Sequence, residues 1–205
     1  MAFVAILIAY VLGSIPVGYI VGRLHGTDVR DHGSGNIGTT NILRLFGAKW
    51  AVMVLLVDVG KGYLACTVAA AMGLAPEIIA LAGVAAIAGH NWSIFLGFAG
   101  GKGAATTAGV FLYLTPVALG IGLSVAGLFW VVTRYMSLGV MVGVGAGAIW
   151  ANVFSGYPGP YSLATLVAFV WILFRHRDNL SRLLRGEERR LGQKEAYGGG
   201  DEDVR

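Results

Sequence analysis

The segment Ala104–Val132, AATTAGVFLYLTPVALGIGLSVAGLFWVV, carries no charge and lies between Lys102 and Arg134. Its 29 residues are too many for one upright membrane span and few for two. Proline tends to end a helix at the preceding residue, so Thr115-Pro116 predicts a short helix before it and a second helix after it. This break would return Arg134 to the side of the membrane where Lys102 lies. One long, tilted helix is the alternative.

The whole chain has the composition of a membrane protein. Of its 205 residues, 56% are hydrophobic and 13% are charged, and its mean hydropathy is +0.71. The first apolar segment lacks the basic n-region of a signal peptide, and we interpret it as an uncleaved span. This first segment is Ala2–Gly22. The other apolar segments of spanning length are Ala51–Met72, Ile78–Phe98, Leu138–Phe154 and Tyr161–Phe174.

The connections between these segments differ in charge. Residues 23–49, Lys102, Arg134 and everything from Arg175 onward are charged, whereas residues 73–77 and 155–160 are nearly uncharged. The positive-inside rule places the charged set in the cytoplasm. The sequence therefore predicts an all-α polytopic membrane protein of about seven transmembrane helices, with its N-terminus outside and its C-terminus in the cytoplasm. We expect one membrane domain over residues 1–186 and a disordered cytoplasmic tail over residues 187–205.

Charge and cysteine content exclude several classes of function. The net charge is +4, but the basic residues lie on loops beside the membrane, and no soluble domain could form a groove for nucleic acid. The single cysteine, Cys66, lies inside an apolar run and is predicted to be a buried spacer. No HExxH or other metal-ligand spacing is present, and neither is an acidic pair of the kind that glycosidases use. An enzyme with these residues would need a substrate that is already activated.

Two glycine-rich polar loops predict a site for an anion. They are GSGNIGTTN at residues 33–41 and GGKG at residues 100–103. Closely spaced glycines let backbone N–H groups converge on an anion, and Lys102 adds positive charge. Caps for a helix that begins near Thr39 or Thr40 would explain one or two of the polar residues in the first loop, but not all. We therefore predict a phosphate-bearing ligand, bound in part by Ser34, Asn36, Thr40, Asn41 and Arg44.

His90 is the main candidate for proton transfer. A lone histidine on an apolar helix is more often a core residue, but Asn91 and Ser93 follow it closely. Polar groups in membrane spans are costly unless they are partnered or functional. Histidine also suits proton transfer near neutral pH, so His90 is a possible general base.

Three further groups are less specific. Asp58 and Lys61 are neighbours on one helix face, and they are either an intramembrane ion pair that helps to hold helices together or contacts for a substrate. The second group has polar residues spaced three apart and consists of His176, Asn179 and Arg182. The helix that carries them either closes the site or is an amphipathic helix at the membrane interface. The third group is Arg134-Tyr135-x-Ser137, which is short and weak evidence alone.

Together these segments resemble the bacterial acyl-phosphate:glycerol-3-phosphate acyltransferases, from about Tyr10 to Gly186. Departures from the family pattern are Thr39 in place of alanine, Ala104 in place of valine and Val140 in place of serine. The matching pieces are Gly13-Ser14-Ile15-Pro16, the stretch from Ser34 to Asn41, Asp58-x-x-Lys61-Gly62, Gly89-His90-Asn91-Trp92-Ser93, Gly100-Gly101-Lys102-Gly103, Arg134-Tyr135-Met136-Ser137 and His176-x-x-Asn179-x-x-Arg182-Leu183-x-x-Gly186.

The resemblance implies an enzyme of phospholipid synthesis in the bacterial inner membrane, with its active site on the cytoplasmic side. Such an enzyme moves a fatty acyl group from acyl phosphate to the 1-hydroxyl of sn-glycerol 3-phosphate and releases lysophosphatidic acid and phosphate. It needs neither a metal nor a cofactor. Its partners are the two substrates and the lipid bilayer, and we expect a monomer. A small transporter of phosphate esters or anions is the alternative function, and a membrane scaffold without catalytic activity is a third.

The resemblance also implies roles for the candidate residues. Ser34, Arg44, Lys102, His176 and Asn179 would bind the glycerol-phosphate headgroup. Gly35, Asn36, Thr40 and Asn41 would hold the acyl phosphate and the oxygen charge that develops during attack. His90 would take the hydroxyl proton or orient donors, and in the second case a substrate phosphate oxygen could be the base. The predicted catalytic set is therefore His90, Asn36, Lys102 and Ser34.

Overall fold

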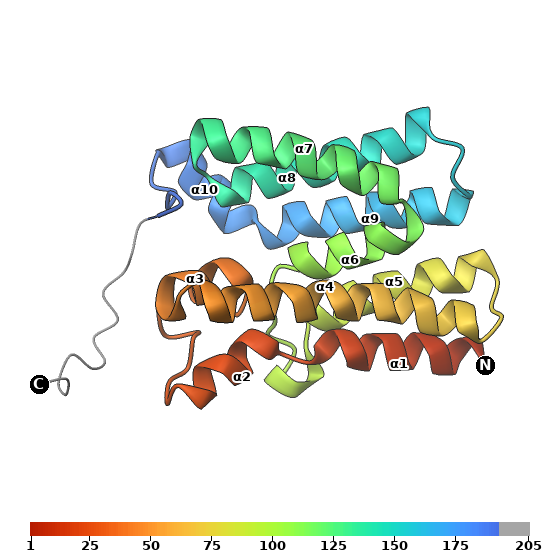
Figure 1. Cartoon of the computed structure of the whole chain (residues 1–205), viewed down its shortest axis with the longest axis horizontal. Helices are drawn as coiled ribbons and strands as arrows, with labels where there is room; N and C mark the ends of the chain where they lie inside the picture. The colour runs from red at the N-terminus through yellow and green to blue at the C-terminus, as the bar shows by residue number, and fades with distance from the viewer. Residues whose placement is uncertain (193–205) are drawn as a thin grey trace, which may run out of the picture.

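The computed structural model describes residues 1–192, which form a helical bundle (Figure 1). Five segments of this part are long and apolar enough to cross a membrane, and two shorter helices are also apolar. The five are α1 with α2 (Ala2–Ser14 and Val17–Leu24), α4 (Ala48–Ala71), α5 with η1 (Pro76–Asn91 and Ile94–Leu96), α7 (Pro116–Thr133), and α8 with the π-helical η2 (Met136–Ile149 and Trp150–Phe154). The shorter pair is α6 (Ala104–Leu114) and α9 (Gly159–Arg175).

The remaining helices, α3 (Thr39–Phe46) and α10 (Arg177–Arg185), lie together at one end of the bundle, which we call the polar end. The N-terminus lies at the opposite end (Figure 1). The nearly uncharged connections from α4 to α5 and from η2 to α9 also lie at that opposite end. Charged and uncharged connections are thus separated along the bundle axis, as the charge pattern predicts.

The bundle consists of two groups of helices. Helices α1, α4, α5 and α6 pack together, and α7, α8 and α9 form the second group. Small residues allow the close approaches that helix packing in membranes favours. A Cβ at Gly89 would overlap the Tyr10 carbonyl between α5 and α1, and a Cβ at Gly143 would overlap the Gly122 carbonyl between α8 and α7.

The predicted break before Pro116 is confirmed. Helix α6 ends at Leu114, Thr115 has an extended φ of −146°, and α7 begins at Pro116. The structure also contains a break that we did not predict, because α1 ends at Ser14 and α2 begins after Pro16. The predicted first span over Ala2–Gly22 therefore corresponds to the candidate span Ala2–Leu24, which is divided into two helices at Ile15 and Pro16.

The break at Pro16 exposes backbone carbonyls that polar side chains satisfy. Ser93 donates its hydroxyl to the Ser14 carbonyl at 2.5 Å, and the Lys61 ammonium donates to the Ile15 carbonyl at 3.0 Å. Backbone groups in a membrane protein need such internal partners because lipid offers none. The Pro16 break is thus stabilised by α4 and by the connection after α5.

The segment after α10 is folded as far as the structure describes it. The Leu191 N–H donates to the Arg134 carbonyl at 2.7 Å, and the Arg134 guanidinium donates to the Leu191 carbonyl at 3.0 Å. The Glu188 side chain is only 6% exposed. Residues 187–192 therefore contact the membrane domain, and the rest of the predicted tail, 193–205, lies outside the described residues.

Candidate active site

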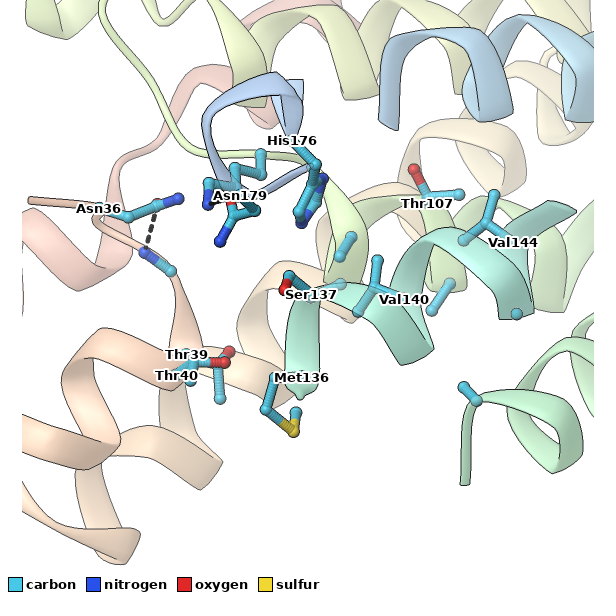
Figure 2. A pocket seen from close by; sticks show the side chains of 18 of the residues that line it. Asn36, Thr39, Thr40, Thr107, Met136, Ser137, Val140, Val144, His176 and Asn179 are labelled. Atoms are coloured by element: carbon cyan, nitrogen blue, oxygen red, sulfur yellow. Dashed lines mark hydrogen bonds between the residues drawn. The ribbon is translucent and has the colours of Figure 1, made fainter. Parts of the chain in front are cut away.

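A cavity of about 380 Å³ opens at the polar end and extends between α6, α7 and α8. This volume lies in the range of small-molecule sites. Figure 2 shows polar side chains around one part of the cavity and Val140 and Val144 around another. The polar and charged residues that line it are Ser34, Asn36, Thr39, Thr40, Asn41, Arg44, Asp58, His90, Lys102, Thr107, Ser137, His176, Asn179, Arg182, Glu188 and Arg189.

The first glycine-rich loop is held in shape by Asn41. This side chain is 1% exposed, and its amide donates to the carbonyls of Val29 and His32, both at 3.1 Å. Its Oδ1 accepts the Ser34 N–H at 2.9 Å. The Asn41 amide is therefore occupied by the loop backbone, and its geometry supports the loop.

Gly35 is not among the residues that line the cavity. Its N–H donates to the His32 carbonyl at 3.0 Å, and its φ of +67° is the left-handed conformation that glycine tolerates. Gly35 therefore forms the turn that carries Ser34 and Asn36 to the cavity wall.

The start of α3 provides hydroxyl and amide groups to the cavity. Asn36 accepts the Gly38 N–H at 2.9 Å, which shapes the turn into α3, and Thr39 and Thr40 form its first turn (Figure 2). Thr39 Oγ1 is buried without a hydrogen-bond partner among the described residues. The first N–H groups of a helix also lack intrahelical partners and favour anions. Arg44 lies one turn further along the same wall.

The second glycine-rich loop also places Lys102 in the lining of the cavity. The Arg175 guanidinium donates to the carbonyls of Gly101 at 2.9 Å and Gly100 at 2.7 Å, which ties the loop to the end of α9. Lys102 donates a short hydrogen bond to Asn179 Oδ1. Burial, and then the positive charge of Arg182, lower the pKa of Lys102 to about 8. An anion next to Lys102 would relieve this unfavourable burial.

His176 lies at the junction of α9 and α10 and is a neutral group. Burial, and then the Lys102 ammonium, lower the pKa of His176 to about 4. Its Nδ1 lies 2.8 Å from the Ile172 carbonyl, so Nδ1 carries the proton and Nε2 is an acceptor. His176 can therefore accept a hydrogen bond from a hydroxyl group at neutral pH.

Glu188 is a site residue that we did not predict. Its carboxylate accepts hydrogen bonds from Ser137 at 2.7 Å, Asn179 at 2.6 Å and Arg182 at 2.9 Å. Burial alone would raise the pKa of Glu188, but these three donors hold it below its ordinary value. The carboxylate thus joins α8 to α10 at the cavity wall. Of the weak Arg134-Tyr135-x-Ser137 group, Ser137 reaches the cavity and Arg134 contacts Leu191 instead.

Asp58, Lys61 and His90 form a buried polar cluster beside the cavity. The Lys61 ammonium lies 2.8 Å from Asp58 Oδ1, and both side chains are at most 5% exposed. The predicted ion pair is therefore present in the structure. Asp58 and His90 also line the cavity, whereas Lys61 lies behind them.

Beyond Thr107 the cavity is lined by apolar residues and reaches the lateral surface of the bundle. Phe111, Leu119 and Val144 line this apolar arm. Two residues that line the cavity, Leu55 on α4 and Leu123 on α7, are 40% and 51% exposed. The cavity therefore reaches the side of the bundle that α4 and α7 form (Figure 1).

Comparisons with known proteins identify the family to which this chain is similar. A family model described as "Glycerol-3-phosphate acyltransferase" matches residues 3–186. A glycerol-3-phosphate acyltransferase of Rubrobacter xylanophilus is 45% identical over 95% of this chain and 97% of its own length. A glycerol-3-phosphate acyltransferase of Thermus thermophilus is 44% identical over 92% of this chain and 94% of its own length.

Two solved structures are also similar. The first is the crystal structure of PlsY (YgiH), an integral membrane glycerol 3-phosphate acyltransferase, in its glycerol 3-phosphate form. It has a TM-score of 0.88 and 35% sequence identity, and the match covers 93% of this chain and 96% of that one. Its lysophosphatidic acid form has a TM-score of 0.85 over 93% of this chain and 95% of that one. This chain is therefore a multi-pass integral membrane protein that belongs to the glycerol-3-phosphate acyltransferase family.

Proposed function

We propose that this protein transfers a fatty acyl group from acyl phosphate to the 1-hydroxyl of sn-glycerol 3-phosphate. The observation that supports it most is one cavity with a polar, cationic part and an apolar arm open to the side of the bundle. A phosphorylated polyol fits the first part and an acyl chain fits the second. Each buried CH₂ of the chain would contribute about 0.8 kcal/mol to binding.

The headgroup of glycerol 3-phosphate would lie between the two glycine-rich loops and α10. Lys102 supplies positive charge beside Asn179, and Arg44 and Ser34 supply donors from the facing wall. The neutral His176 would accept a hydrogen bond from a glycerol hydroxyl through Nε2. Both charged and neutral groups of the substrate would therefore have partners.

The acyl phosphate would bind at the start of α3. Thr39 and Thr40 present hydroxyls there, Asn36 presents its amide, and the helix N-terminus favours negative charge. The same donors can stabilise the oxygen charge that develops on the carbonyl during attack. The acyl chain would continue into the apolar arm.

The reaction needs no protein nucleophile because acyl phosphate is a mixed anhydride with a good leaving group. The substrate hydroxyl oxygen forms a bond to the carbonyl carbon, and the bond from that carbon to the phosphate oxygen breaks. The hydroxyl proton leaves with the phosphate product. The protein contributes by holding two phosphorylated molecules close together and by stabilising charge.

For the membrane arrangement we infer seven spans: the five long segments and the shorter α6 and α9. The basic residues at the polar end support a cytoplasmic location of the site in a bacterial inner membrane, with the N-terminus outside. One chain encloses the cavity, which supports a monomer.

A direct assay tests the reaction. Purified protein is incubated with glycerol 3-phosphate and either palmitoyl phosphate or palmitoyl-CoA, and lysophosphatidic acid is measured. We expect product with palmitoyl phosphate, and product with the CoA ester alone would refute the donor assignment. Lys102→Ala and Ser34→Ala should reduce transfer at least about 100-fold while membrane insertion persists. Near-normal activity of both variants would contradict the site assignment.

The transporter alternative predicts a different result. It needs a polar path through the bundle, whereas the cavity lining is apolar beyond Thr107. Vesicles that contain the protein, without acyl donor, should therefore not accumulate labelled glycerol 3-phosphate. Uptake above that of empty vesicles would favour transport.

A further inference from the structure

A chain of buried polar groups connects the break in the first span to the lysine loop. It begins at the Ile15 carbonyl, which accepts a hydrogen bond from Lys61 Nζ at 3.0 Å. Lys61 Nζ also lies 2.8 Å from Asp58 Oδ1. Both side chains are at most 5% exposed, so each charge is compensated mainly by the other.

The next contact in the chain joins Asp58 to His90. Asp58 Oδ1 lies 3.7 Å from His90 Nδ1, and both atoms are buried. Asp58 Oδ1 is already paired with Lys61 Nζ, whereas His90 Nδ1 has no hydrogen-bond partner among the described residues. Buried polar atoms in native proteins are nearly always paired, so the Asp58 carboxylate is the natural partner of His90 Nδ1. A small movement would turn this contact into a hydrogen bond.

The opposite side of the histidine ring supports the loop 100–103. His90 Nε2 lies against Gly101, where an added Cβ would overlap it. The His90 carbonyl also accepts the Gly101 N–H at 3.0 Å. A Cβ at Gly100 would overlap the same carbonyl. The loop that presents Lys102 is therefore packed directly on His90.

We propose that Asp58 and Lys61 are positioning residues that act through His90 on the loop 100–103. Asp58 accepts the Nδ1 proton of His90, which orients the ring and leaves Nε2 unprotonated against Gly101. Lys61 neutralises Asp58 and links both to the Pro16 break. His90 thereby supports the backbone on which Lys102 stands, and it is not the proton acceptor of the reaction. This inference rests on the proposed function because its effect is on glycerol 3-phosphate binding.

The kinetic test removes both charges together. Asp58→Asn alone would leave Lys61 as an uncompensated buried charge, which is strongly destabilising. The double variant Asp58→Asn/Lys61→Met avoids that. Cys66→Ala, a buried change on the same helix outside the chain of groups, is the matched control. Steady-state transfer is measured in detergent, together with the thermal unfolding of each variant.

We expect the double variant to raise the KM for glycerol 3-phosphate about 10- to 100-fold, because a displacement of about 1 Å in a substrate-binding group can cost about 100-fold. The KM for acyl phosphate should change less than about threefold, since the proposal places the effect on the loop 100–103 and not on the start of α3. Cys66→Ala should keep both values. A folded double variant whose KM for glycerol 3-phosphate stays within about twofold of wild type would overturn the proposal.

A second measurement uses the wild-type protein and does not depend on a variant that folds. The ring nitrogens of ¹⁵N-histidine-labelled protein are observed by NMR, and His90→Gln identifies the His90 signals. We expect Nδ1 protonated and Nε2 unprotonated, and the opposite tautomer would overturn the proposal. Wild-type protein without acyl transfer activity would instead refute the proposed function, while the tautomer result would still stand.

Discussion

The titration of Lys102 should control how glycerol 3-phosphate binding depends on pH. Burial, and then Arg182, lower the pKa of Lys102 from 10.5 to about 8. The lysine of the free protein would then be about 90% charged at pH 7 and about 10% charged at pH 9. The second pKa of a phosphate ester is about 6, so the substrate stays a dianion throughout this range. If only the charged lysine binds it, kcat/KM should fall about tenfold between pH 7 and pH 9.

The assay measures initial rates at low glycerol 3-phosphate from pH 6.5 to 9.5, with donor hydrolysis subtracted at each pH. A bound dianion raises the pKa of Lys102, so kcat should fall at a higher pH than kcat/KM. Lys102→Arg should give a flat kcat/KM profile, because a guanidinium stays charged. His176 is neutral over the whole range, since its pKa is about 4. A flat wild-type profile, or a parallel fall in Lys102→Arg, would refute the reasoning.

Three further predictions concern the tail segment, the loop and the apolar arm. Glu188→Gln should lower the unfolding temperature by roughly 5 °C while Glu187→Gln does not, because three hydrogen bonds to a carboxylate are weakened. Since the pKa of Glu188 is lowered, its stabilisation is present at neutral pH and is lost as the pH falls through that pKa, so wild type and Glu188→Gln should converge in acid. Gly101→Ala should raise the KM for glycerol 3-phosphate at least about tenfold because its Cβ overlaps His90, and an unchanged KM would contradict the packing. Val144→Trp should raise the KM for palmitoyl phosphate about tenfold without changing glycerol 3-phosphate affinity, whereas the exposed Leu128→Trp should change neither.

The two proline breaks show what a single sequence can and cannot reveal. The break before Pro116 could be predicted because Lys102 and Arg134 flank a segment that is long for one span. Pro16 obeys the same physics, but its segment has the length of one span and no charge that an unbroken helix would misplace. Its carbonyls are satisfied by Lys61 and Ser93, whose proximity depends on the tertiary fold.

The candidate site was predictable by residue type but not by orientation. The sequence places polar side chains near one end of the bundle, and the structure brings both loops to one cavity. The hydrogen bonds of Asn41 and the turn at Gly35 depend on the path of the loop backbone, which spacing does not determine. Glu188 was missed because its partner Ser137 is 51 residues away, and charged residues after the last helix are typical of a solvated tail.

The cavity reaches the side of the bundle at two exposed leucines, Leu55 and Leu123, so the acyl donor would enter it from within the lipid bilayer. A donor that partitions into lipid would arrive by diffusion in the plane of the bilayer, while the polyol phosphate arrives from water. The turnover rate should then follow the mole fraction of donor in the vesicles, not its amount per volume. Diluting that donor with inert lipid would slow the enzyme even when every bulk concentration is held constant.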